Sequence, residues 1–186
     1  MAVELVFVTG GVRSGKSRFA LEEAARLGEN GTVTFVATAG DPGADIDMAR
    51  RVAEHREARP GDWATIEAGT DLGAALRQAS ASDVVLIDDL TQWASRILLA
   101  SGDPEAPGFR AVAEKAADGA LADLFWALDE ISATVIVVTN EVGSGVSPAT
   151  RLGNVYADVL GALNRRVAER SDRAYLLVSG LSVRLK

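Results

Sequence analysis

The sequence contains no cysteine and only one histidine among its 186 residues. The missing cysteines exclude disulfide bonds, thiolate nucleophiles and zinc sites with cysteine ligands, and a single histidine excludes a histidine-rich metal site. Lysine and arginine (19 residues) are outnumbered by aspartate and glutamate (26 residues), which gives a formal net charge of −7. This balance argues against a general binder of nucleic acids or anionic membranes, because such proteins present a basic surface. It does not exclude a local anion site.

Long apolar runs are also missing. The longest runs, at residues 84–87 and 135–138, are far shorter than the ~20 residues that span a bilayer. The first residues carry an acidic side chain where a signal peptide has a basic segment. We therefore expect a cytoplasmic protein without a membrane partner, and the length predicts one domain over residues 1–186.

Short apolar runs alternate with longer amphipathic segments along the chain. The short runs are typical of strands buried on both faces, and the longer segments have helical periodicity. This alternation predicts an α/β fold with a mostly parallel sheet and helices on both faces. We expect strands at residues 3–8, 32–37, 84–87, 134–138, 174–178 and, shorter, 182–185, with helices at residues 16–27, 46–58, 72–79, 93–100, 112–131 and 149–170.

A glycine-rich loop with the pattern G-x-x-x-x-G-K-[ST] follows the first expected strand. Its glycines let the backbone curl around phosphate oxygens, and the next helix adds its dipole. Lys16 would neutralise the β- and γ-phosphates, and the Ser17 hydroxyl would ligate Mg²⁺. The alternative is an ordinary turn with a chance Lys-Ser pair, but the strand before and the helix after favour a P-loop NTPase-like (RecA-like) domain. The loop comprises Gly10, Gly11, Val12, Arg13, Ser14, Gly15, Lys16 and Ser17.

Two carboxylates, Asp88 and Asp89, follow the apolar run at residues 84–87. This is the layout of a Walker B element, whose acid binds the metal of a P-loop site. Neighbouring side chains of a strand alternate in direction, so only one carboxylate should face the nucleotide. We favour Asp88 as the metal ligand over Asp89, and the alternative is a surface turn that ends the strand.

The single histidine, His55, lies near the end of the expected helix at residues 46–58, shortly before Pro60. Its neighbours in sequence are charged, and this window alone favours a solvated surface histidine. Arg56 and Arg59 would nevertheless suit a phosphate delivered to the imidazole. The positions of this helix that we expect in the core are Met48, Ala49, Val52 and Ala53.

Seven segments, in order along the chain, carry a family resemblance. They are VTGGVRSGKS (8–17), FVATA (35–39), HREARPGDWATIE (55–67), LIDDLTQW (86–93), VVTNEVGSGVSP (137–148), RLGNVYADVLGALNRRVA (151–168) and LLVSGLSVRLK (176–186). Together they resemble the bifunctional adenosylcobinamide kinase / adenosylcobinamide-phosphate guanylyltransferase family of cobalamin biosynthesis. Many NTPases share the P-loop, whereas the block H-x-x-x-R-P-x-x-W-x-T-x-E is specific.

The resemblance implies two reactions. ATP or GTP phosphorylates adenosylcobinamide, and GMP is then transferred from GTP to adenosylcobinamide phosphate through a guanylylated histidine. The histidine of the family falls on His55, which makes His55 the expected nucleophile beside Lys16. The P-loop implies bound Mg²⁺, and the family implies a homo-oligomer, a trimer with active sites near the subunit interfaces.

The resemblance also implies a set of nucleotide contacts. The Glu67 carboxylate would accept hydrogen bonds from N1–H and N2–H of guanine, a pairing that adenine does not offer. Besides the P-loop, the expected GTP-binding residues are Ala37, Thr38, Ala39, Arg56, Glu57, Ala58, Arg59, Glu67 and Asp88.

Residues 39–44 and Asp89 depart from the usual family pattern. Two other functions stay open at this point. A P-loop small-molecule kinase without guanylyl transfer would need the P-loop and Asp88 but would have no use for His55. A nucleotide-dependent switch would need no turnover, but guanine-specific switches usually carry an [NT]-K-x-D element, and residues 139–142 do not provide one.

Overall fold

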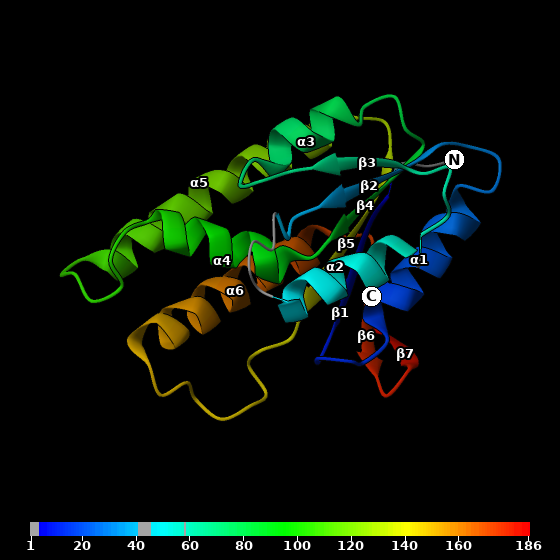
Figure 1. Cartoon of the computed structure of the whole chain (residues 1–186). Helices are drawn as coiled ribbons and strands as arrows, with labels where there is room; N and C mark the ends of the chain where they lie inside the picture. Colours follow the sequence, from blue (N-terminus) through cyan, green and yellow to red (C-terminus); the bar gives the residue numbers. More distant parts are fainter. Residues whose placement is uncertain (1–3, 41–45, 58) are drawn as a thin grey trace.

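The computed structural model describes residues 4–40, 46–57 and 59–186 (Figure 1). The strands are β1 (Leu5–Gly10), β2 (Val33–Ala37), β3 (Ala64–Glu67), β4 (Val84–Asp88), β5 (Thr134–Asn140), β6 (Arg173–Val178) and β7 (Leu181–Arg184). The helices are α1 (Lys16–Leu27), α2 (Ile46–Glu57), α3 (Leu72–Gln78), α4 (Leu90–Ala100), α5 (Phe109–Glu130) and α6 (Arg151–Arg170).

The described strands form one sheet in the order β3-β2-β4-β5-β1-β6-β7. All neighbouring strands are parallel except β6 and β7, which form an antiparallel hairpin. The α/β fold with a mostly parallel sheet is therefore confirmed. The inner strands β1, β4 and β5 are buried along nearly their whole length, because parallel strands with helices on both faces meet no solvent.

Helices cover both faces of the sheet (Figure 1). Alternate residues of each strand serve the two faces, so Val85 and Ile87 pack in one apolar core while Val84 and Leu86 pack in the other. The larger core includes side chains of α3, α4, α5 and α6, and the smaller core includes side chains of α1. This layering holds the loops at the carboxyl edge of the sheet in place.

Several element boundaries differ from the sequence predictions for local reasons. The helix expected from residue 93 begins at Leu90, because the Asp89 carboxylate accepts a hydrogen bond from the Thr91 amide and caps α4. The helix expected from residue 112 begins at Phe109, a buried residue directly after Gly108. The strand β3 was not predicted, because its side chains are exposed or half-buried and give no apolar run.

The first expected strand, at residues 3–8, runs from Leu5 to Gly10 in the structure, and residue 3 lies outside the described residues.

The core prediction for α2 is wrong for Ala53, which is exposed, while Ala49 and Val52 are half-buried. Among the side chains of α2 that the structure describes, none is buried. The side chain of Met48 is outside the described part. Among all the residues that the structure describes, no helix is both long and apolar enough to cross a membrane.

The fully buried Trp93 of α4 anchors this helix, and its indole Nε1 donates a hydrogen bond to the carbonyl oxygen of Thr70 at 2.7 Å. We expect Trp93→Ala to lower the free energy of unfolding by about 3–5 kcal/mol, because it leaves a cavity and an unpaired carbonyl. Trp126 is 67% exposed, so Trp126→Ala is the matched control with little expected change. Urea denaturation of both variants measures the difference, and equal losses would contradict this account.

Candidate functional site

The carboxyl ends of the parallel strands bring distant residues to one edge of the sheet. Ala37 at the end of β2 is paired with Glu67 on one side and with Asp88 on the other. Gly10 at the end of β1 is paired with Asn140 at the end of β5. Ligands of open α/β sheets bind at this edge. The strand order therefore makes it the candidate active site.

The P-loop connects β1 to α1 at this edge. The Ser14 amide donates to the Gly11 carbonyl oxygen at 3.2 Å, and Lys16 Nζ donates to the same oxygen at 3.4 Å. Arg13 and Gly15 have φ values of 58° and 95°, in the left-handed region. Lys16 is buried at the start of α1, so its ammonium is held by the loop that it would serve in phosphate binding.

The turn between β6 and β7 supports the P-loop from outside. The Gly180 amide donates to the Ser14 carbonyl oxygen at 2.8 Å. A β-carbon at Gly15 would lie 3.2 Å from the α-carbon of Gly180, so the two chains touch closely here. The C-terminal hairpin thus helps to shape the P-loop.

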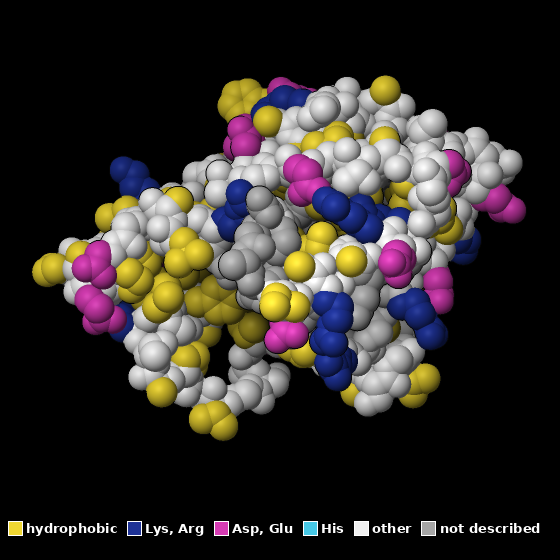
Figure 2. Space-filling view, viewed as in Figure 1, with side chains coloured by type: hydrophobic (Ala, Val, Ile, Leu, Met, Phe, Trp, Pro, Cys, Tyr) yellow, Lys and Arg dark blue, Asp and Glu magenta, His cyan; other side chains and the backbone are white. Residues whose placement is uncertain are grey.

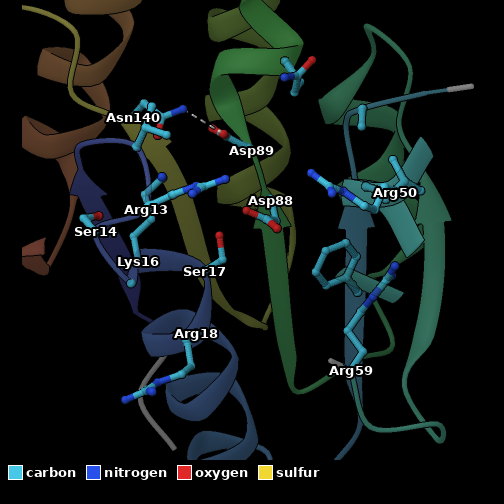
Figure 3. A pocket seen from close by; sticks show the side chains of 17 residues that line it. Arg13, Ser14, Lys16, Ser17, Arg18, Arg50, Arg59, Asp88, Asp89 and Asn140 are labelled. Atoms are coloured by element: carbon cyan, nitrogen blue, oxygen red, sulfur yellow. Dashed lines mark hydrogen bonds between the residues drawn. The ribbon is translucent and has the colours of Figure 1, made fainter. Parts of the chain in front are cut away.

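A cavity of about 690 Å³, the first cavity, opens beside the P-loop (Figure 3). Of its described lining residues, five are cationic and two are carboxylates. Cationic groups around a concave site attract polyanions such as nucleotide phosphates. The cavity is lined by Val12, Arg13, Ser14, Gly15, Lys16, Ser17, Arg18, Phe35, Ala37, Ala39, Arg50, Val52, Arg59, Asp88, Asp89, Gln92 and Asn140.

Ser17 and Asp88 face each other across the first cavity (Figure 3). A hydroxyl and a carboxylate are oxygen ligands of the kind that Mg²⁺ prefers, and Mg²⁺ commonly takes its remaining ligands from phosphates and water. The residues predicted as metal ligands thus lie together. Among the described residues, no group of three or more His, Cys, Asp and Glu side chains is arranged to hold a metal ion by itself.

The neighbouring carboxylate, Asp89, is used differently. Its Oδ1 accepts a hydrogen bond from the Thr91 amide at 2.9 Å, and its Oδ2 accepts one from Asn140 Nδ2 at 3.3 Å. Burial raises the pKa of Asp89, and the charge of Asp88 adds to this shift. Asp89 thus caps α4 and ties β4 to β5, and the preference for Asp88 as the metal ligand stays a prediction.

Arg59 closes the first cavity on the side opposite the P-loop (Figure 3). Its Cζ lies 3.9 Å from the centre of the Phe35 ring, and its Nη1 donates to Thr65 Oγ1 at 3.2 Å. Burial lowers the pKa of Arg59. Stacking on an aromatic ring orients the guanidinium for contact with phosphate.

A second cavity of about 790 Å³ adjoins the first, because Val52 of α2 lines both. Arg56, Glu57 and Glu67 line the second cavity and not the first. Arg56 Nη2 lies 3.4 Å from Glu67 Oε1. On the surface, Lys and Arg side chains gather on the side of the molecule where α1 and α2 lie (Figure 2). The second cavity is lined by Gly40, Ala49, Val52, Ala53, Arg56, Glu57, Glu67, Gly69 and Arg96.

The three residues of the segment at 37–39 do not all face the first cavity. Ala37 and Ala39 line the first cavity, whereas the side chain of Thr38 is fully buried. The Thr38 hydroxyl donates to the Asp89 carbonyl oxygen at 2.7 Å and accepts from the Asp89 amide at 2.8 Å. The Thr38 side chain therefore joins β2 to β4 and does not line the first cavity.

Two predicted site residues fall on parts that are not described. His55 lies in α2, but its side chain is outside the described part, and Ala58 lies outside the described residues altogether. Position 55 is three residues after Val52 in the same helix. Since Val52 lines both cavities, α2 carries the single histidine beside the candidate site.

The structure adds residues that sequence reasoning did not assign to the site. Asn140 follows the apolar run of β5 as Asp88 follows that of β4, and this parallel was an available signal. The arginines Arg18, Arg50 and Arg96 gave no signal, because charged residues on amphipathic helices are ordinarily solvated. The others that line a cavity are Phe35, Gly40, Ala49, Val52, Ala53, Gly69 and Gln92.

Comparison with known proteins extends over nearly the whole chain. A sequence model of the family described as cobinamide kinase / cobinamide phosphate guanyltransferase matches residues 6–185. The bifunctional adenosylcobalamin biosynthesis protein CobU of Salmonella typhimurium is 36% identical over 186 residues, covering 98% of this chain and 99% of the relative. Its counterpart CobP of Pseudomonas aeruginosa is 39% identical over 180 residues, covering 96% and 95%. CobU of Escherichia coli is 34% identical, covering 98% and 99%. These matches confirm the resemblance seen in the seven sequence segments.

Proposed function

Because the chain belongs to the cobinamide kinase / cobinamide phosphate guanyltransferase family, we propose that it catalyses two successive transfers. It phosphorylates adenosylcobinamide with ATP or GTP, and it then transfers GMP from GTP to adenosylcobinamide phosphate. The product is adenosyl-GDP-cobinamide, with pyrophosphate released. The observation that carries this proposal is a cationic cavity beside a P-loop, bordered by the helix that holds the only histidine.

The kinase step follows from the first cavity. The substrate hydroxyl attacks the γ-phosphorus, the bond to the β-phosphate oxygen breaks, and the hydroxyl proton is released. The P-loop amides and Lys16 bind the β- and γ-phosphates and stabilise the charge that builds up during transfer. Arg59, stacked on Phe35, supports this from the opposite wall.

We propose that Ser17 and Asp88 hold the Mg²⁺ ion that accompanies the nucleotide. Their hydroxyl and carboxylate oxygens fit this hard cation, and both line the first cavity. When bound, the ion would neutralise phosphate charge and orient the triphosphate. The residues of the chain then need only keep the acceptor hydroxyl in line with the γ-phosphorus.

The guanylyl transfer uses His55 as nucleophile. A ring nitrogen of the neutral imidazole attacks the α-phosphorus of GTP, and pyrophosphate leaves. A phosphate oxygen of adenosylcobinamide phosphate then attacks the same phosphorus, which forms the new P–O bond and releases the imidazole. Arg56 and Arg59 follow His55 in sequence and lie at the second and first cavities respectively. Arg59, at the first cavity, would balance the charge of the phosphate groups that meet there.

We expect Asp88→Asn to reduce Mg²⁺-dependent turnover by about 10²-fold, the scale of a lost metal ligand worth several kcal/mol. Asp89→Asn should stay within about threefold of the unaltered protein, because asparagine caps a helix as well as aspartate. The measurement is kcat for both half-reactions as a function of Mg²⁺ concentration. Only Asp88→Asn should require more Mg²⁺, and a larger effect of Asp89→Asn would reverse the assignment of the two carboxylates.

The overall function is tested by supplying adenosylcobinamide with ATP and GTP and identifying the products by mass spectrometry. The proposal expects adenosylcobinamide phosphate first and adenosyl-GDP-cobinamide second. A kinase without guanylyl transfer would stop at the phosphate, and a regulatory nucleotide binder would form neither product. The cytoplasmic location and the homo-trimer stay predictions. Light scattering of the purified protein measures the oligomeric state.

A further inference from the structure

The two adjoining cavities differ in charge. Among the described lining residues, the first cavity has five cations and two carboxylates, whereas the second has two arginines and two glutamates. The rest of the second cavity consists of small or apolar residues: Gly40, Ala49, Val52, Ala53 and Gly69. A balanced polar rim over small apolar walls suits a flat, uncharged ring better than a polyanion. The phosphates of a nucleotide therefore belong in the first cavity and its base in the second.

Arg96 enters the second cavity from α4 and has no role in the function proposed so far. It is half-buried, and its Nη1 lies 3.4 Å from the carbonyl oxygen of Thr38. Within the described ranges, no carboxylate lies at ion-pair distance from this guanidinium. Most of its five N–H donors are thus available to a ligand.

Gly40 and Gly69 make room for the Arg96 guanidinium. Gly40 has a left-handed φ of 69°, and a β-carbon at this position would overlap Nη1 of Arg96. A β-carbon at Gly69 would lie 4.0 Å from Nη2. The two glycines leave the planar end of Arg96 bordered by backbone, where a ring can approach it.

We propose that Arg96 is a specificity-determining residue that recognises the O6 and N7 atoms of guanine in the second cavity. Arginine pairs with these two acceptors through two parallel N–H donors. Adenine has an amino group at position 6, which would meet the donors of Arg96 with a donor of its own. This inference rests on the proposed use of GTP, and it places base recognition on α4 as well as on β3.

Glu67 complements Arg96 on the same cavity. Its carboxylate would accept hydrogen bonds from N1–H and N2–H, which leaves O6 and N7 for a donor from elsewhere in the cavity. The ion pair between Arg56 and Glu67 has side chains that are 64% and 52% exposed. Exposed pairs of this kind are weak, so guanine can displace Arg56 from the carboxylate.

Guanine analogues separate the two contacts. The compound 7-deaza-GTP lacks the N7 acceptor, 6-thio-GTP has a poor acceptor at position 6, and inosine triphosphate lacks only the N2 amino group. The unaltered protein should bind each of them about 10-fold or more weakly than GTP, as expected for a lost base contact. Dissociation constants measured by calorimetry do not depend on turnover, so they test Arg96 even if guanylyl transfer fails.

We expect Arg96→Ala to bring the affinities for GTP, 7-deaza-GTP and 6-thio-GTP within about twofold of one another. Its preference for GTP over inosine triphosphate should remain. Glu67→Ala should show the opposite pattern, with the preference over inosine triphosphate lost and the other two retained. Arg96→Lys keeps the positive charge but not the planar pair of donors, so its discrimination among GTP, 7-deaza-GTP and 6-thio-GTP should fall between those of the unaltered protein and Arg96→Ala.

Two results would overturn the proposal. The first is an unaltered protein that binds GTP, 7-deaza-GTP and 6-thio-GTP equally well. The second is an Arg96→Ala variant that weakens all nucleotides by one common factor, which would make Arg96 a phosphate contact or a structural residue. Thermal unfolding of each variant shows whether a uniform loss comes from the fold. Failure of the proposed function would instead appear as absent product with intact discrimination among the analogues.

Discussion

The His55→Ala variant is expected to take up no label from α-labelled GTP, whereas the unaltered protein takes up one GMP per chain. Attack of an imidazole nitrogen on the α-phosphorus forms a phosphoramidate, which is stable to base and released by acid. The chain has no cysteine and no second histidine, so no other residue of comparable chemistry replaces His55. Autoradiography after acid or base treatment of the denatured protein measures the result.

Three controls make the His55 result specific. Label from γ-labelled GTP should not remain on the protein, because pyrophosphate is the leaving group. Labelling should decrease as the pH falls below about 6.5, since the protonated imidazole has no free electron pair for attack. The kinase half-reaction should survive His55→Ala at least in part. Undiminished acid-labile labelling of His55→Ala would assign the nucleophile to one of the lysines.

Lys16→Ala should abolish both half-reactions, with losses of about 10³-fold or more in kcat/KM. The ammonium of Lys16 is buried at the start of α1 and is held by the Gly11 carbonyl oxygen at 3.4 Å. Its removal leaves phosphate charge uncompensated in a cavity where water cannot fully replace it. Both the γ-phosphate of the kinase step and the pyrophosphate of the guanylyl step depend on this group.

The matched control for Lys16→Ala is Lys115→Ala, an exposed lysine of α5. It removes one positive charge from the same chain without touching either cavity, so both half-reactions should keep their rates. Initial rates at varied nucleotide concentrations measure the effect on each half-reaction. Near-normal rates for Lys16→Ala would remove the P-loop from the mechanism.

Local patterns in the sequence predicted the P-loop and the acidic residue after β4. In both cases a short apolar run sets the strand, and the residues directly after it provide the chemistry. A strand end and the loop that follows it are joined covalently, so their relation does not depend on the rest of the fold. The structure accordingly places Lys16, Ser17 and Asp88 around one cavity. Asp89 was harder to judge, because its tie to Asn140 of β5 crosses between strands that are distant in sequence.

The sequence by itself determined the α/β class, the phosphate-binding loop, the candidate nucleophile and, through its seven segments, the family. Only the tertiary structure decided that the site has two cavities of different charge. Arg59 and Arg56 stand three residues apart, yet they line different cavities, and Arg96 joins Glu67 from a separate helix. The physical reason is that periodicity and spacing report local backbone geometry, whereas a cavity forms where strand order brings the ends of β3, β2 and β4 together.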